Sequence, residues 1–245
     1  MISRRTLLRW FGAVAPAAAG PAQAGDSAAD QRARMVAVID QRMRETAGST
    51  GRRALGATVR QAMGRVERHR FVPPELAAQA YGDHPLPIDH GQTISQPFIV
   101  ALMTDLLEPK AGDTLLEVGT GSGYQAAVLA ECGARVYTIE IVAPLGLRAR
   151  ALLAELGYGA VEVRIGDGYL GWPQAAPFDG ILVTAAPDHV PQPLVDQLKP
   201  GGRMVIPVGP QRVGQDLLLI TKSADGRTVS RRTLPVRFVP LTRDR

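Results

Sequence analysis

Leu115-Leu116-Glu117-Val118-Gly119-Thr120-Gly121-Ser122-Gly123-Tyr124 is the stretch that decides the fold. An apolar run ends in an acid and then in three glycines at alternate positions, and a helical pattern over residues 125–130 follows at once. This succession predicts a strand, a tight turn and a helix N-terminus, the unit in which a doubly wound sheet receives a nucleotide-like cofactor. Glycines permit both the sharp turn and the close approach of a ligand, because they carry no Cβ.

The spacing of the glycines separates two classes of cofactor. Dinucleotide-binding turns have the pattern G-x-G-x-x-G, and their helix N-terminus binds a pyrophosphate. Here the pattern is G-x-G-x-G, with Glu117 two residues before the first glycine. A carboxylate at that place suits a cofactor with a cationic or amino-acid end, and S-adenosylmethionine has such an end. A nicotinamide dehydrogenase would need the spacing that is absent.

Two further acids follow the next two predicted strands. Residues 135–139 predict a strand with Glu140 at its end, where an acid can accept hydrogen bonds from both ribose hydroxyls. Residues 161–165 predict another strand, followed by Asp167 between two glycines, where a carboxylate can reach an adenine amino group. Each feature alone is common in turns and helix starts. Their succession at the carboxyl edge of one sheet favours a cofactor site.

The alternation of strands and helices from Thr114 to Ile206 predicts an α/β fold. We expect a doubly wound, mainly parallel sheet with helices on both faces, a Rossmann-like methyltransferase fold. Residues 216–221 and 228–239 predict a closing antiparallel hairpin. The remaining predicted elements are helices at 31–45, 55–66, 75–81, 97–107 and 191–198, a loop at 81–92, and strands at 178–184 and 203–207.

Composition restricts the possible partners. The 245 residues, 45% hydrophobic and 21% charged, suffice for one domain with an ample core. The net charge of +5 falls to +2 without the first 24 residues, so we expect no nucleic-acid partner. No stretch predicts a membrane span, and we expect a monomer. We expect four arginines to lie on a solvated strand face, and we expect the thiol of Cys132 to be buried. The histidines show no metal-ligand spacing, so we predict no metal site. The arginines are Arg227, Arg231, Arg232 and Arg237.

The N-terminus has the features of a processing segment. Arg4 and Arg5 form a twin arginine, an apolar run from Trp10 to Ala19 follows, and small residues at 22–24 suit cleavage. We therefore expect a twin-arginine export signal at 1–24, a linker at 25–34 and a single domain at 35–245. This leader predicts a periplasmic protein. The alternatives are a cytoplasmic protein, since S-adenosylmethionine is made inside cells, and initiation at Met35.

Further segments carry a resemblance to a known family. They are Arg70–Pro73, Tyr81–Ile88, Gly91–Pro97, Val183–Ala186, Gln197–Gly202, Pro207–Gly209 and Val236–Leu241. In this order, over residues 35 to 242, the chain resembles the protein-L-isoaspartate O-methyltransferases. The segments 91–97 and 236–241 are specific to that family, whereas most methyltransferases share the glycine turn. The resemblance implies methyl transfer from S-adenosylmethionine to the free α-carboxylate of isoaspartyl residues in damaged proteins, which starts their repair.

The resemblance also implies a role for individual residues. Ser95 would be the active-site hydroxyl. The cofactor would be bound by Thr93, Ile94, Glu117, Gly119, Gly121, Gly123, Glu140, Asp167 and Gly168. The substrate backbone would be bound by Val183, Thr184, Ala185, Val236, Phe238 and Val239. Two residues depart from the family pattern: Asp89, where glycine is usual, and Pro144, which must lie in the first turn of a helix.

The chemistry needs no general base. An α-carboxylate has a pKa of about 3.5 and is ionised at neutral pH. What remains is alignment of the reacting atoms and exclusion of water. Ser95 would orient the carboxylate, and it could also cap the helix that follows Pro97. The alternatives are a methyltransferase for another carboxylate small molecule or for RNA, and a non-catalytic peptide-binding relic.

Overall fold

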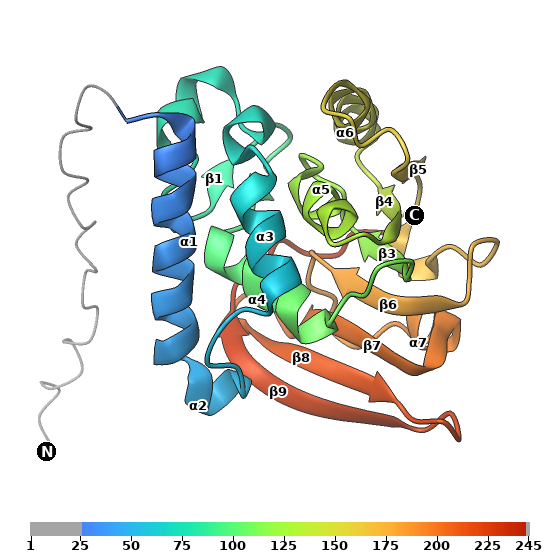
Figure 1. Ribbon diagram of the computed structural model, residues 1–245. Helices are drawn as coiled ribbons and strands as arrows, with labels where there is room; N and C mark the ends of the chain where they lie inside the picture. Colours follow the sequence, from blue (N-terminus) through green and yellow to red (C-terminus); the bar gives the residue numbers. More distant parts are fainter. Residues whose placement is uncertain (1–25, 244–245) are drawn as a thin grey trace, which may run out of the picture.

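A seven-stranded sheet forms the centre of the fold (Figure 1). The structure, a computed structural model, describes residues 26–243, so the predicted leader lies outside the described residues. The strands are β3 (Thr114–Val118), β4 (Arg135–Glu140), β5 (Glu162–Ile165), β6 (Phe178–Val183), β7 (Leu198–Val208), β8 (Gln215–Lys222) and β9 (Thr228–Val236). Their order is β5-β4-β3-β6-β7-β8-β9. The first five are parallel to one another, and β8 and β9 are antiparallel. The predicted mainly parallel sheet with a closing hairpin is confirmed.

Helices cover both faces of this sheet. They are α1 (Ala28–Glu45), α2 (Ala47–Thr50), α3 (Ala57–Arg65), α4 (Pro97–Leu107), α5 (Tyr124–Glu131), α6 (Ala143–Glu155) and α7 (Gln192–Gln197), with the 3-10 turns η1 (Arg68–Phe71), η2 (Pro74–Gln79) and η3 (Gly168–Leu170). Pro144 lies in the first turn of α6, as expected. In Figure 1, α1, α3 and α4 stand in front of the sheet, with α7 beyond strand β7.

Alternation along the strands divides the core in two. Leu115 and Leu182 point to the face covered by α1, α3, α4 and α5, and join the larger apolar cluster. Their neighbours Leu116 and Ile181 point to the other face and pack with Leu194 of α7. Successive side chains of a strand face opposite sides, so one run of apolar residues supplies both clusters.

The strand order reverses beside β3, and this reversal places the site. Strand β4 follows β3 in the chain and lies on one side of it, whereas β6 lies on the other side. Loops leaving β3, β4 and β6 therefore separate at their carboxyl ends, and such a switch point is where doubly wound sheets bind ligands.

The first helix begins earlier than predicted. Ser27 accepts a hydrogen bond from the backbone N–H of Asp30, whose side chain accepts one from the backbone of Ser27. This capping box starts the helix at Ala28, before the predicted start at residue 31. Residues 28–34, expected in a linker, are helical, and Arg32 donates to the carbonyl of Gly64 at 2.7 Å. The predicted linker boundary at 34 is therefore wrong.

The predicted loop at 81–92 contains a small hairpin. Strands β1 (Leu86–Pro87) and β2 (Thr93–Ile94) pair antiparallel. His90 and Gly91 both have left-handed backbone, with φ of 60° and 68°, as in type I′ turns. Asp89 precedes them and does not have positive φ, so an aspartate fits where the family usually has glycine. Its carboxylate forms an ion pair with Arg148 of α6.

Membrane-spanning helices and metal-ligand clusters were sought among the side chains of residues 26–243. None of the described helices combines the length and apolarity that a bilayer crossing requires. Within residues 26–243 no group of His, Cys, Asp and Glu is arranged to hold a metal ion. Cys132 is buried, as predicted, and burial raises the pKa of its thiol to about 12.

Candidate active site

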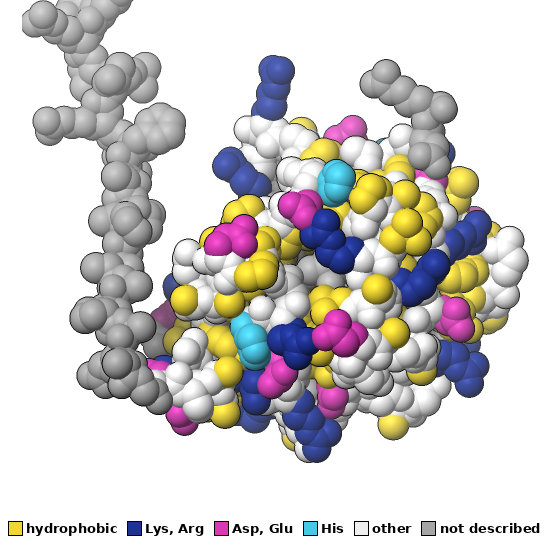
Figure 2. Space-filling view, turned by 90° about the horizontal axis from the view of Figure 1, so that it is seen from above, with side chains coloured by type: hydrophobic (Ala, Val, Ile, Leu, Met, Phe, Trp, Pro, Cys, Tyr) yellow, Lys and Arg dark blue, Asp and Glu magenta, His cyan; other side chains and the backbone are white. Residues whose placement is uncertain are grey.

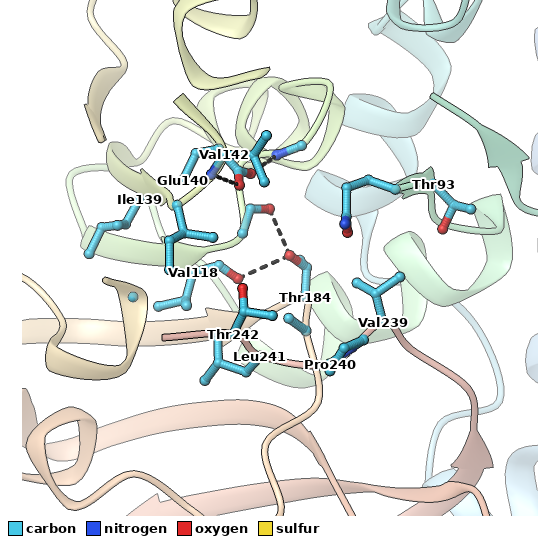
Figure 3. A pocket seen from close by; sticks show the side chains of 16 residues that line it. Thr93, Val118, Ile139, Glu140, Val142, Thr184, Val239, Pro240, Leu241 and Thr242 are labelled. Atoms are coloured by element: carbon cyan, nitrogen blue, oxygen red, sulfur yellow. Dashed lines mark hydrogen bonds between the residues drawn. The ribbon is translucent and has the colours of Figure 1, made fainter. Parts of the chain in front are cut away.

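Two cavities meet at the carboxyl edge of the sheet. Thr93, Thr184 and Val239 line both of them. The first cavity is bordered by the glycine turn, the end of β4 and residues 239–242 (Figure 3). The second is bordered by Ser95, the end of β9 and the loop between β7 and β8. A molecule in one cavity can therefore reach a molecule in the other at the three shared residues.

The three glycines of the turn have different neighbours. All have positive φ: 102° at Gly119, 52° at Gly121 and 90° at Gly123. A Cβ on Gly119 would lie 2.3 Å from Oγ1 of Thr184, and one on Gly123 would lie 3.3 Å from Leu153. A Cβ on Gly121 would have only Ile88 within 4 Å, and Gly121 itself lines the first cavity. Gly121 is thus the glycine whose missing side chain leaves room for a ligand.

Glu140 is held at the rim of the first cavity. Oε2 accepts a hydrogen bond from the backbone N–H of Gly121 at 2.8 Å, and Oε1 accepts one from Val142 at 2.9 Å (Figure 3). The residue is 6% exposed and lines the cavity. Each carboxylate oxygen retains a further lone pair, so Glu140 can accept two hydroxyl groups from an orientation that the backbone fixes.

Asp167 and Gly168 lie beside the same cavity. Gly168 lines it, and a Cβ there would lie 2.5 Å from Val118. Asp167 accepts a hydrogen bond from the backbone N–H of Tyr169 at 2.8 Å and one from Arg243 at 3.3 Å. Its side chain is 7% exposed. The carboxylate is therefore positioned from both sides, while Asp167 itself does not line the cavity.

Glu117 lies inside the protein and does not line the cavity. Its Oε2 accepts a hydrogen bond from Thr138 at 2.6 Å, and its Oε1 has no partner among the described residues. Burial raises the pKa of this carboxyl to about 8. The hydrogen bond from Thr138 opposes the rise, and the charge of Glu140 adds to it. The predicted contact between Glu117 and the cofactor stays a prediction.

A wall of the first cavity was missing from the sequence prediction. Pro240, Leu241 and Thr242 line it, together with Ile139, Ile141 and Val142 after β4. Figure 3 shows the C-terminal residues across the cavity from Glu140 and Val142. The signal was present in the family-specific segment 236–241, of which only Val236, Phe238 and Val239 were expected at the site, as substrate residues.

The second cavity collects most of the predicted substrate residues. Ser95, Val236, Phe238 and the shared Thr184 and Val239 line it, while Ala185 lines the first cavity. Val183 and Ile94 line neither cavity, because their side chains are in the core, 0% and 4% exposed. The predicted cofactor residues Glu117, Gly123 and Asp167 also line neither.

Among the described residues that line the second cavity, Arg237 is the one with a charge. The four arginines predicted on a solvated strand face therefore have different surroundings, because only Arg237 lines the cavity. Arg227 and Arg232 form ion pairs with Asp225 and Asp216, and Arg231 donates to backbone carbonyls near α2.

Asp83 fixes the segment that carries Ser95. Its Oδ1 accepts from the backbone N–H of Phe98 at 3.0 Å, and its Oδ2 accepts from the side chain of Gln96 at 2.9 Å. The N-cap of α4 is Gln96, whose own side chain makes no capping bond. Ser95 is therefore not the cap of this helix, and its hydroxyl is left to the second cavity.

The whole chain was compared with known proteins. The family model described as protein-L-isoaspartate(D-aspartate) O-methyltransferase matches residues 49–245. The chain belongs to this family. It is 56% identical over 234 residues to protein-L-isoaspartate O-methyltransferase 1 of Nitrosospira multiformis, covering 96% of this chain and 94% of the relative. It is 57% identical over 211 residues to protein-L-isoaspartate O-methyltransferase 2 of a Polaromonas species, covering 86% of this chain and 100% of the relative.

Solved members of the protein-L-isoaspartate O-methyltransferase family share the fold. One with that name has a TM-score of 0.73 at 27% identity, covering 86% of this chain and 66% of its own. A Plasmodium falciparum structure, described as a putative member in complex with S-adenosyl-L-homocysteine, has a TM-score of 0.71 at 25% identity. The match covers 86% of this chain and 98% of that chain. The resemblance noted in the sequence is confirmed, and the matched region contains every predicted site residue.

Proposed function

We propose that this protein transfers a methyl group from S-adenosylmethionine to the free α-carboxylate of isoaspartyl residues, at the junction of the two cavities. The observation that carries this proposal is the sharing of Thr93, Thr184 and Val239 by the cavity beside the glycine turn and the cavity beside Ser95. The product is a methyl ester, from which repair of the damaged residue proceeds.

The first cavity fits the cofactor. Gly121 lines this cavity without a side chain, and Glu140 presents two fixed oxygens to a pair of hydroxyls. Glu140 would bind the ribose, and Asp167 with Gly168 would bind the adenine. Gly119 and Gly123 shape the turn, since their Cβ positions point at Thr184 and Leu153. When bound, S-adenosylmethionine supplies a methyl group that is already activated on a sulfonium.

The second cavity fits a carboxylate on a peptide. An α-carboxylate is ionised at neutral pH, so no residue needs to remove a proton from it. Arg237 provides a positive charge in the lining, and Ser95 provides a hydroxyl that can donate to a carboxylate oxygen. Val236, Phe238 and Val239 would hold the peptide while the cavity walls exclude water.

Binding of the peptide main chain at the second cavity would favour isoaspartate over aspartate. An isoaspartyl residue lengthens the backbone by one methylene and carries its free carboxylate on the α-carbon. If residues 236–239 bind the peptide main chain, the carboxylate reaches Thr93 and Thr184 only in this lengthened form. A misplacement of about 1 Å costs on the order of a hundredfold in rate.

Matched isoaspartyl and aspartyl peptides test this proposal. We expect methylation of the isoaspartyl peptide at a rate at least about a hundredfold above that of its twin. Ser95→Ala should lower kcat by about tenfold and leave cofactor affinity unchanged, since the lost hydrogen bond is to the acceptor. Ser223→Ala, in the turn between β8 and β9, is the control. Equal rates on both peptides, or transfer to RNA or a small acid alone, would overturn the proposal. Cofactor binding without transfer would leave a peptide-binding relic.

The remaining expectations concern partners and location. We propose a monomer without a nucleic-acid partner, because on the face in Figure 2 basic side chains are interspersed with acidic ones. Sedimentation and a binding assay with RNA test both statements. For the leader, Arg4→Lys with Arg5→Lys should retain the protein inside the cell, since the export receptor reads the arginine pair. A wild-type protein found in the cytosol with residues 1–24 attached would contradict export.

A further inference from the structure

The C-terminal segment is tied to the sheet edge beside the cofactor cavity. The backbone N–H of Ala186 donates to the carbonyl of Val239 at 2.8 Å, and the N–H of Leu241 donates to the carbonyl of Ala186 at 3.0 Å. These two bonds lay residues 239–242 along the cavity, where all four contribute to its lining. Residues 239–242 therefore form a wall of the cavity, and Arg243 is the residue that follows them.

Arg243 forms a hydrogen-bonded ion pair with Asp167 at the end of this wall. Its Nε donates to Oδ2 of Asp167 at 3.3 Å, and its guanidinium carbon lies 4.1 Å from the centre of the Tyr169 ring. The Tyr169 hydroxyl in turn lies 2.5 Å from Nε2 of His189, and the Tyr169 backbone donates to Oδ1 of Asp167. A stacked arginine, an aromatic ring and a buried carboxylate thus form one unit.

This unit has a consequence for the base of a bound cofactor. The side chain of Asp167 is 7% exposed, and its Oδ2 is paired with the guanidinium of Arg243. An ionised carboxylate accepts hydrogen bonds and donates none, so it binds an amino group and rejects a carbonyl. With one lone pair on each oxygen used by Tyr169 and Arg243, the others remain for a ligand.

We propose that Arg243 is a positioning residue for the cofactor: it fastens the C-terminal wall and holds the carboxylate of Asp167 in the orientation that accepts a hydrogen bond from the adenine amino group. The proposal rests on the proposed role of Asp167 at the adenine end. Arg243 acts through Asp167 and the wall, and it does not touch the transferred methyl group. Cofactor affinity and selectivity for adenine over hypoxanthine therefore depend on residue 243.

Calorimetry with two product analogues tests the proposal without turnover. The probes are S-adenosylhomocysteine and S-inosylhomocysteine, in which a carbonyl replaces the adenine amino group. Arg243→Ala should raise the Kd of the adenine compound about three- to tenfold and reduce its advantage over the hypoxanthine compound by a similar factor. Arg243→Lys keeps the charge but loses the planar stack, so it should restore part of both effects.

The matched control is Arg227→Ala, which removes an exposed arginine paired with Asp225 in the β8–β9 turn. It should leave both Kd values unchanged. With Arg243→Ala, kcat at saturating cofactor should stay within about twofold of wild type, since no reacting atom is touched. Unchanged Kd values and selectivity in Arg243→Ala would overturn the proposal, and so would tighter binding, which would make Arg243 a competitor of adenine. The peptide assay tests the proposed methyl transfer, whereas calorimetry tests the role of Arg243, so failure of one proposal can be distinguished from failure of the other.

Discussion

The carboxylate of Glu140 accepts a hydrogen bond from the backbone N–H of Gly121 across 2.8 Å. This bond joins the end of β4 to the turn that leaves β3. The acid proposed to bind the ribose therefore also holds the loop that makes room for the cofactor. A substitution of either residue should therefore also change the position of the other.

Glu140→Ala should weaken S-adenosylmethionine binding by about 1.5–3 kcal/mol, the range for hydrogen bonds to a charged group. A 2′,3′-dideoxy analogue should lose most of its sensitivity to this substitution, because it lacks the two hydroxyls. Calorimetry measures both. Glu162→Ala, an exposed acid at the start of β5, is the control and should have no effect. Equal sensitivity of the two cofactors to Glu140→Ala would place this carboxylate away from the ribose.

Gly121→Val should abolish cofactor binding while the protein remains folded. Gly121 lines the first cavity, and a valine side chain there would occupy open space, since its Cβ would meet only Ile88 at 3.7 Å. The left-handed backbone at φ 52° adds strain of roughly 1–2 kcal/mol. Gly226→Val is a matched control, because that glycine has φ 83° and open space around it in the β8–β9 turn. It should lose similar stability and keep the cofactor. Unchanged affinity in Gly121→Val would remove the site from the glycine turn.

Glu117 should make the ligand-free protein less stable as pH rises. Its pKa is raised by burial from 4.5 to about 8, so between these values the folded protein keeps a proton that the unfolded chain has lost. Folding then takes up a proton, and the free energy of unfolding falls with rising pH across this window. Glu117→Gln is neutral at every pH and should remove this dependence. At pH 8 it should be more stable than wild type, by an amount on the order of a few kcal/mol.

Denaturant unfolding at pH 5 and pH 8 checks this expectation. The stability difference between Glu117→Gln and wild type should be small at the lower pH and large at the higher one. Parallel stability curves for the two proteins would mean that Glu117 titrates with an ordinary pKa. In that case its carboxylate would be available to a cationic group of the cofactor, as the sequence predicted.

The parts of the site that the sequence predicted are local. The glycine turn, Glu140 and Asp167 each follow a strand directly, and parallel strands bring their carboxyl ends to one edge. Ser95 was found through a family-specific segment. The burial of Glu117 could also have been inferred from strand alternation. Leu115, two residues earlier, faces the side of the sheet covered by α1, α3, α4 and α5, and Glu117 faces the same side.

The parts that the sequence did not predict depend on contacts between distant segments. Arg243 reaches Asp167 across 76 positions of the chain, and the cavity wall at 240–242 depends on hydrogen bonds to Ala186. The capping side chain of α4 is Asp83, which lies fifteen positions before Phe98, the residue whose backbone N–H donates to it. Local propensity favours a capping side chain at the helix start itself, so it pointed to Ser95.

Asp83→Ala should slow methyl transfer through Ser95 without touching the substrate. It removes the acceptor of the Phe98 amide and of the Gln96 side chain, and so releases the start of α4. The lost cap costs about 0.5–2 kcal/mol of stability, and displacement of the adjacent Ser95 should lower kcat by roughly ten- to a hundredfold. Cofactor affinity should not change. Asp113→Ala removes a similar bond, to the amide of Lys110 in the turn before β3, and should lower stability alone. If both variants lose the same stability and keep wild-type kcat, Asp83 is a helix cap with no part in placing Ser95.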